Sequence, residues 1–219
     1  MRGFRRLGVL GLVLVAGSAW GQAGLQNANS ELLLAARSGR VATVTALLEQ
    51  GANPNSRNRI GDTPLNTAAK KGDAAIVKLM LERGADVNLQ NASGVSPLMS
   101  AAFNGHADIV KLLLAHKADP TSVDRIMKTA AIYAAGTGHA DCLAALLDGG
   151  VGVDAVYAND LTALMWAAGS GQAATVKLLL ARGADVTRRD NRGKTALAMA
   201  LDKGDRETID ALRAAGAKE

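Results

Sequence analysis

Residues 61–89 read GDTPLNTAAKKGDAAIVKLMLERGADVNL, and this stretch decides the fold. Thr63 is a residue type that caps helix N-termini, and Pro64 suits the first helical position because its missing N–H needs no partner there. A short helix is predicted from there to Gly72, where glycine permits the left-handed backbone that ends a helix. A second, apolar helix then runs to Gly84, which ends it in the same way. The stretch therefore predicts a pair of helices followed by a turn.

The same phrase returns every 33 residues from about residue 30 to the C-terminus. Three features keep the period: a Gly that closes the first helix, a Gly that closes the second, and an Ala pair in the first helix. The first Gly series is Gly39, Gly72, Gly105, Gly138, Gly171 and Gly204, the second is Gly51, Gly84, Gly150, Gly183 and Gly216 with Lys117 in one place, and the Ala pairs are 35/36, 68/69, 101/102, 134/135 and 167/168. Such a period is typical of stacked units that bury their apolar faces only against neighbours. It predicts a function on a surface.

The repeated phrase resembles the ankyrin repeat. The family pattern of Gly-x-Thr-Pro-Leu, Ala-Ala, Gly-His, Ile-Val, Leu-Leu and Gly-Ala-Asp-Val-Asn is matched by residues 61–65, 68–69, 105–106, 109–110, 112–113 and 84–88. The resemblance covers about residues 25–219 and implies an all-α ankyrin repeat solenoid of helix–turn–helix units with protruding β-turn or hairpin fingers. It divides the domain 24–219 into an N-terminal capping unit, four full repeats and a C-terminal capping unit, namely 25–56, 57–89, 90–122, 123–155, 156–188 and 189–219.

The chain departs from the family pattern in two ways. The His that commonly follows Thr-Pro-Leu is replaced in every unit, so the side-chain hydrogen bonds it gives in relatives are expected to be missing. The residues in its place are Asn66, Met99, Ile132, Met165 and Ala198. Repeat 123–155 is the least regular, with Met127 in place of the turn Gly and Ala130 in place of Pro, and we expect the lowest local stability there.

The N-terminal segment 1–23 has the pattern of a secretory signal peptide. Arg2, Arg5 and Arg6 precede an apolar run over residues 7–20, and small residues follow at the positions that a signal peptidase requires. Cleavage after Ala19 and cleavage after Ala23 are both compatible with this pattern. The run is shorter than the roughly 20 residues of a membrane span, which favours cleavage over the rival, an uncleaved N-terminal anchor. We expect a periplasmic or secreted protein with no membrane span after cleavage.

The net charge of +5 comes largely from this leader. Without its three Arg residues, the 25 basic side chains fall to 22 against 20 acidic ones, a net charge of +2. Nucleic-acid binding needs many cations on one face, so no nucleic-acid partner is predicted.

No motif indicates a metal, a cofactor or catalysis. Residues 139–142, His-Ala-Asp-Cys, contain three types of metal ligand, but residues 105–108 repeat the phrase at the equivalent helix start, so a structural role is favoured over a metal site. The single cysteine, Cys142, falls where other repeats have Ile76 and Ile109, which predicts a small core residue. No nucleophile turn or phosphate-binding loop is present, so the chain is predicted not to be an enzyme and to bind no cofactor.

The recognition surface implied by the resemblance is the concave face, formed by the finger turns and the exposed side of the first helices. Positions there that vary between repeats are the candidates for partner binding. They are Arg59, Ile60, Lys70, Lys71, Val95, Phe103, Asn104, Arg125, Ile126, Lys128, Tyr157, Asn159, Leu161, Arg192 and Lys194. Phe103 shares its repeat position with Lys70 and Asp202, which predicts that its ring is exposed. For Tyr133 and Trp166, packing between units and partner contact both remain open.

Charges and aromatic residues are distributed unevenly over this set. The outer fingers are basic, whereas all four aromatic residues after the leader lie in the central repeats, and interfaces tend to have aromatic anchors at the centre and charges at the rim. We therefore predict a monomeric, non-enzymatic module that holds or protects another, exported protein. An inhibitor or immunity protein of a toxic enzyme is the alternative, and a hydrolase with a site assembled across repeats is a third hypothesis.

Overall fold

Each helix begins and ends at the residues that the repeat pattern indicates. In α3 (Pro64–Lys71) the Thr63 hydroxyl accepts the N–H of Asn66 at 3.1 Å, and Gly72 ends the helix with φ 81°. The N-cap of each later first helix is Ser96 or a Thr and accepts the equivalent bond. Lys117 occupies a position that is otherwise glycine and has φ 65°, so the backbone there keeps the same left-handed turn.

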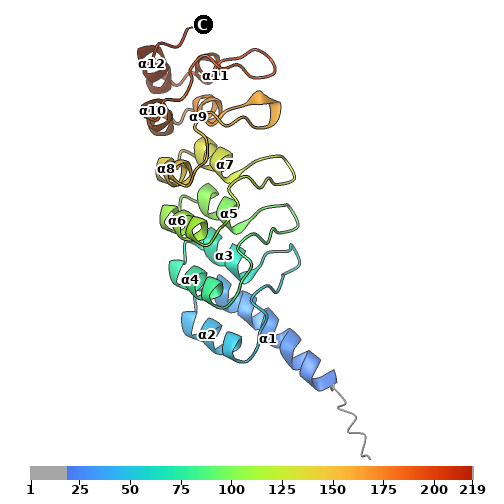
Figure 1. Ribbon diagram of the computed structural model, residues 1–219. Coiled ribbons are helices and arrows are strands. Elements are labelled where there is room, and N and C mark those ends of the chain that lie inside the picture. Colours follow the sequence, from blue (N-terminus) through green and yellow to red (C-terminus); the bar gives the residue numbers. More distant parts are fainter. Residues whose placement is uncertain (1–18, 219) are drawn as a thin grey trace, which may run out of the picture.

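The computed structural model describes residues 19–218, with side chains from Asn27 onward. The first helices are α1 (Ala19–Arg37), α3 (Pro64–Lys71), α5 (Pro97–Phe103), α7 (Ala130–Thr137), α9 (Ala163–Ser170) and α11 (Ala196–Lys203), and the second helices are α2 (Val41–Glu49), α4 (Ala74–Glu82), α6 (Ala107–Ala115), α8 (Ala140–Asp148), α10 (Ala173–Ala181) and α12 (Arg206–Ala214). Each kind forms one row, and the loops between pairs project to the side away from the second helices (Figure 1). No strand occurs within residues 19–218, so the array is all-α.

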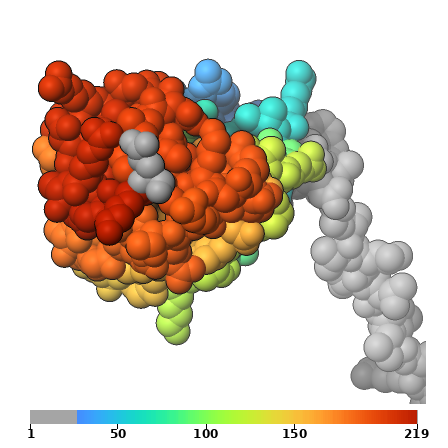
Figure 2. Space-filling view, turned by 90° about the horizontal axis from the view of Figure 1, so that it is seen from above, coloured from blue at the N-terminus to red at the C-terminus, as the bar shows by residue number. Residues whose placement is uncertain are grey.

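One apolar core runs through the whole stack. The Ala pairs of the first helices, such as Ala68 and Ala69, are completely buried, because each first helix packs against the first helix before and after it. The C-terminal unit lies across the end of the array that faces the viewer in Figure 2. The core is thus made by contacts between neighbours, as expected for a solenoid.

The finger loops precede the first helices, and four of the five are shaped by one Asn or Asp side chain. These loops comprise residues 57–63, 90–96, 123–129, 156–162 and 189–195. In the second loop the Asn91 side-chain oxygen accepts the backbone N–H groups of Ser93 and Val95, and an Asn or Asp does the same in the first, third and fifth. Neighbouring loops are also linked, since Ala92 donates its N–H to the Ile60 carbonyl at 3.1 Å. The fingers therefore form a connected row.

This row is interrupted between the third and fourth fingers. Backbone bonds link the first to the second, the second to the third and the fourth to the fifth, but among the described residues no equivalent bond joins the third to the fourth. Tyr157 takes the position of the Asn or Asp, and Asn159 and Asp160 both have positive φ within the short 3₁₀ helix η1 (Ala158–Asp160). Met127 also has positive φ, at 63°. The irregularity extends beyond repeat 123–155 into the next finger.

Two sequence-based expectations need comment at the N-terminal side. Among the residues that replace the His after Thr-Pro-Leu, the buried Asn66 makes a side-chain hydrogen bond of its own, from its amide to the Leu89 carbonyl at 3.1 Å. Most of the predicted leader, residues 1–18, lies outside the described residues. Helix α1 begins at Ala19 and passes through both predicted cleavage positions.

Candidate functional site

The concave face is defined here as the finger loops together with the exposed sides of α3, α5, α7, α9 and α11 (Figure 1). Its centre carries a continuous row of large side chains. Phe103, at the end of α5, is 49% exposed, as its repeat position predicts. Its ring meets the Tyr133 ring of α7 edge to face, with centroids 5.5 Å apart and an interplanar angle of 89°. This geometry stabilises an aromatic pair beyond its buried area.

Lys128 extends the row to the next repeat. Its Nζ lies 5.5 Å from the centroid of the Tyr133 ring and 4.6 Å from that of Trp166 in α9, so the ammonium contacts both π systems. Tyr133 and Trp166 are half-buried, so each ring packs against the array on one side and faces the solvent on the other. The central row is therefore Phe103, Tyr133, Lys128 and Trp166, from three consecutive repeats.

A buried carboxylate holds this row in place. Asp124 is 5% exposed and accepts a hydrogen bond from the Tyr133 hydroxyl. It also accepts hydrogen bonds from the two backbone N–H groups that shape its finger loop. Burial, followed by the hydrogen bond and negative charge of Asp124, raises the pKa of Tyr133 well above its usual value. Tyr133 therefore stays protonated and connects the third finger to the helix row.

On the N-terminal side of the row lies a cavity of about 240 Å³ between the first two fingers and the helices α3 and α5. It brings together five of the candidate residues, from the first finger, α3, the second finger and the end of α5. These are Ile60, Lys70, Val95, Phe103 and Asn104. Ile60 is 61% exposed, so its apolar side chain is accessible at the edge of a cavity that Lys70 also lines. The cavity can accept an apolar group, with a cation at its margin.

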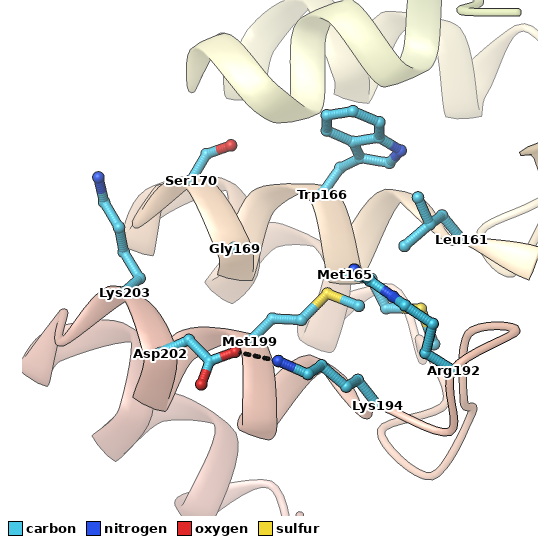
Figure 3. A pocket seen from close by; sticks show the side chains of 10 residues that line it. All are labelled: Leu161, Met165, Trp166, Gly169, Ser170, Arg192, Lys194, Met199, Asp202 and Lys203. Atoms are coloured by element: carbon cyan, nitrogen blue, oxygen red, sulfur yellow. Dashed lines mark hydrogen bonds and ion pairs between the residues drawn. The ribbon is translucent and has the colours of Figure 1, made fainter. Parts of the chain in front are cut away.

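On the C-terminal side a larger cavity, of about 440 Å³, lies between α9, α11 and the last finger (Figure 3). Leu161, Met165, Trp166 and Met199 provide its apolar surface. The candidates Leu161, Arg192 and Lys194 are among its lining residues, and so is Trp166, for which partner contact had been left open. Met165 and Met199 are lining residues that sequence reasoning did not place on this surface. The repeat period could have indicated Met199, because it shares the position of Tyr133 and Trp166.

The charged groups of this cavity are ordered by short contacts. Lys194 Nζ lies 2.5 Å from Asp202 Oδ2, and Arg192 Nη2 lies 2.9 Å from Asp190 Oδ2, whose side chain is 1% exposed. Burial opposes the ionisation of Asp190, but hydrogen bonds from the backbone of Lys194 and from Arg192 outweigh it and hold the pKa of that carboxyl below its usual value. Asp190 is therefore ionised at neutral pH and positions the last finger.

Seven candidates lie outside the lining of the two cavities, and one of them, Lys128, belongs to the central row. Lys71 donates to the Arg37 carbonyl at 2.5 Å and lines a groove toward the N-terminal unit. Arg59, Arg125, Ile126 and Asn159 are exposed on the finger tips. Tyr157 is half-buried against the core and lines a separate cavity together with Val123, Met127 and Val156. Tyr157 thus serves the junction of the third and fourth fingers.

The residues considered for metal binding or catalysis are part of the repeat framework. Within residues 19–218 no group of three or more His, Cys, Asp and Glu side chains is placed to hold a metal ion. The His106 Nε2 lies 3.2 Å from the Lys70 carbonyl of the preceding repeat, so this ring links units. Cys142 is completely buried, and burial, followed by the charges of Asp141 and Asp108, raises the pKa of its thiol to about 11. The core position predicted for Cys142 is confirmed.

Known proteins of similar sequence and structure share this architecture. The sequence matches the family described as "Ankyrin repeats (3 copies)" over residues 32–124 and 131–218. The structure is similar to the crystal structure of the human ASB11 ankyrin repeat domain, with a TM-score of 0.79 and 30% identity over 85% of this chain and 84% of that one. It is also similar to the crystal structure of EF0377, an ankyrin repeat protein, with a TM-score of 0.74 and 35% identity over 83% of this chain and 96% of that one. No curated protein gave a significant match.

The stacked helix pairs and their common core define a solenoid repeat protein. The matched residues and the similar structures then specify the class: the chain belongs to the ankyrin repeat family. Domains of this family generally act as modules that bind other proteins. Among the helices that the structure describes, none has the length and apolar character needed to span a membrane.

Proposed function

We propose that this chain is an exported, non-enzymatic module that holds or protects another exported protein on its concave face. The observation that carries the proposal is the central row of Phe103, Tyr133, Lys128 and Trp166, which offers aromatic surface between two cavities. Fully or partly exposed aromatic residues at the centre of a surface, with cations around them, are the usual anchors of a protein interface.

Cations surround the central row at the margins of both cavities. Lys70 lies beside the N-terminal cavity, and Arg192, Lys194 and Lys203 line the C-terminal one. Charges at a rim influence the rate and the salt dependence of association more than its final strength. Association with the partner should therefore slow as ionic strength rises, while the central aromatic contacts retain the complex.

Photo-crosslinking from position 103 in living cells of the source organism tests this assignment. The matched control carries the same crosslinker in place of Lys111, an exposed residue of α6 on the opposite side of the helix pairs. We expect a single protein to be captured from position 103 and not from position 111. Equal capture from both positions would show that the concave face is not the binding surface. A captured hydrolase that is inactive in the complex would instead identify the chain as an inhibitor.

A pair of substitutions separates binding from folding. Phe103→Asp places a charge in the central row, and Val41→Asp places one at an exposed apolar residue at the start of α2. Phe103→Asp is expected to abolish capture while the helical circular dichroism remains unchanged, and Val41→Asp is expected to affect neither. Capture that survives Phe103→Asp argues against this face.

Export is supported by the composition of residues 1–23 and needs a test of its own. We expect cell fractionation to place the protein outside the cytoplasm, and N-terminal sequencing of that fraction to begin at Trp20 or Gly24. A chain that begins at Met1 in that fraction would indicate the uncleaved anchor, and a chain confined to the cytoplasm would refute export.

A further inference from the structure

The C-terminal cavity combines apolar walls with a cationic margin. The half-buried Trp166 and Met199 face it from successive first helices, and Leu161 closes it from the fourth finger (Figure 3). Gly169 also lines the cavity and adds no side chain of its own. The volume of about 440 Å³ is within the range of sites that take a side chain together with its adjoining main chain.

The cations that line this cavity outnumber the carboxylates that line it. Arg192, Lys194 and Lys203 line it, whereas Asp202 is the one carboxylate among its lining residues. Asp202 is engaged by the Lys194 ammonium, and the Arg192 guanidinium gives two of its five N–H donors to Asp190 and has a side chain that is 67% exposed. Asp190 and Asp202 thus offset the charges of Arg192 and Lys194, and the margin offers Lys203 and the remaining N–H donors of Arg192 and Lys194 next to an apolar wall.

We infer that this cavity binds an apolar side chain that stands next to an Asp or Glu in the partner protein. The apolar group packs between Trp166 and Met199, and the neighbouring carboxylate accepts hydrogen bonds from Lys194 and Arg192 at the margin. This inference rests on the proposed function, because it assumes that the concave face binds a protein, and it adds the chemistry by which one part of that protein is recognised.

Asp202 competes with the carboxylate of the partner for the Lys194 ammonium. Its Oδ2 already lies 2.5 Å from Lys194 Nζ and neutralises that charge. Removing its charge should strengthen binding of an acidic ligand and leave a neutral ligand of the same shape unaffected. A purely structural role of Asp202 would change the binding of both ligands alike.

Trp166 supplies a local signal for the test. The chain has two tryptophans, so a full-length Trp20→Phe variant reports the emission of Trp166 alone. The probe is the acetylated and amidated peptide Gly-Leu-Glu-Leu-Gly, and its twin has Gln in place of Glu. We expect saturable changes in emission with a millimolar Kd for the Glu peptide and binding about fivefold weaker for the Gln twin, as for other exposed ion pairs.

Substitutions then assign the effect to the cavity. Lys194→Gln should weaken the Glu peptide about fivefold, Asp202→Asn should strengthen it severalfold, and neither should alter the Gln twin. Lys111→Gln, on the exposed surface of α6, is the matched control and should change nothing. The fivefold difference between the peptides should shrink at high salt.

Each other result overturns the inference. Equal binding of the Glu and Gln peptides means an apolar pocket without charge recognition, and the absence of a saturable change means that the cavity takes neither. If the Gln twin binds only when its C-terminus is a free carboxylate, the ligand is a chain end rather than an acidic side chain. In all three cases crosslinking from position 103 can still succeed, so the failure of this inference is distinct from failure of the proposed function.

Discussion

Replacing Thr175 by Val should stabilise the protein, although it removes a polar group. Thr175 lies in α10, is completely buried, and its hydroxyl has no hydrogen-bond partner. The position is Ile76 in the second repeat unit and Cys142 two units later, so the surroundings are those of an apolar side chain. The hydroxyl was thus transferred from water into the core with nothing gained in return.

The expected magnitude follows from that burial. An unsatisfied buried hydroxyl destabilises a protein by about 1–3 kcal/mol, and Val has nearly the shape of Thr with a methyl group in its place. Allowing for imperfect packing of the new methyl group, Thr175→Val should raise the free energy of unfolding by about 1–2 kcal/mol. For a chain of this size each kcal/mol corresponds to about 2–4 °C, so Tm should rise by about 2–8 °C.

The matched control is the same substitution at Thr63, whose hydroxyl caps α3 by accepting the Asn66 N–H at 3.1 Å. Thr63→Val should lower the free energy of unfolding by about 1 kcal/mol, because the cap is lost. Thermal unfolding followed by circular dichroism gives the sign, and hydrogen exchange of the α10 amides shows whether the gain is local. A Thr175→Val variant no more stable than the original would refute the reasoning, since the hydroxyl would then have a partner such as a buried water.

The remaining predictions concern three other sites. Met127→Asn should slow hydrogen exchange in the third finger, because Met127 has φ 63° and Asn tolerates that conformation better; faster exchange would contradict this. Cys142, with its buried thiol, should react with a thiol reagent at neutral pH only after denaturation, and rapid labelling of the native protein would refute that placement. The pKa of Asp190 is lowered in the folded state, so its ionised form stabilises the protein at pH values above the unfolded pKa of about 4. This stabilisation is lost as the pH falls through the lower folded pKa. The difference in stability between the original protein and Asp190→Asn should therefore shrink on acidification, which urea titrations at several pH values can check.

The sequence predicted the helices and the core because the 33-residue period repeats local signals. Thr63 begins α3 and Gly72 ends it, and each does so through contacts within a few residues of itself. Both roles can therefore be predicted from the residue type. The same comparison by repeat position predicted the exposure of Phe103 and the burial of Cys142. Where each repeat carries the same residue type, six copies of one signal leave little ambiguity.

Contacts between repeats were harder to predict. The hydrogen bond from Asn66 to Leu89 joins residues 23 positions apart, and the cation–π contact of Lys128 with Trp166 joins residues 38 positions apart. No local sequence pattern encodes either contact. The irregular fourth finger did have a signal, since Tyr157 stands at the position where the other fingers have Asn or Asp. That signal shows only when the repeats are compared loop by loop, because loops vary more than helices for many reasons.

Lys128 joins what would otherwise be two separate sites. The N-terminal cavity ends at Tyr133 and the C-terminal cavity begins at Trp166, and the Lys128 side chain lies over both rings. It arises from the third finger, which among the described residues shares no backbone hydrogen bond with the fourth, so at the finger level the two halves of the concave face are linked less firmly than at the level of the helices. At this junction the cation–π contact of Lys128 with Trp166 takes the place of the backbone hydrogen bond that links the other neighbouring fingers. A partner that spans both cavities must therefore pass over Lys128, which makes that residue a determinant of whether the face binds as one surface.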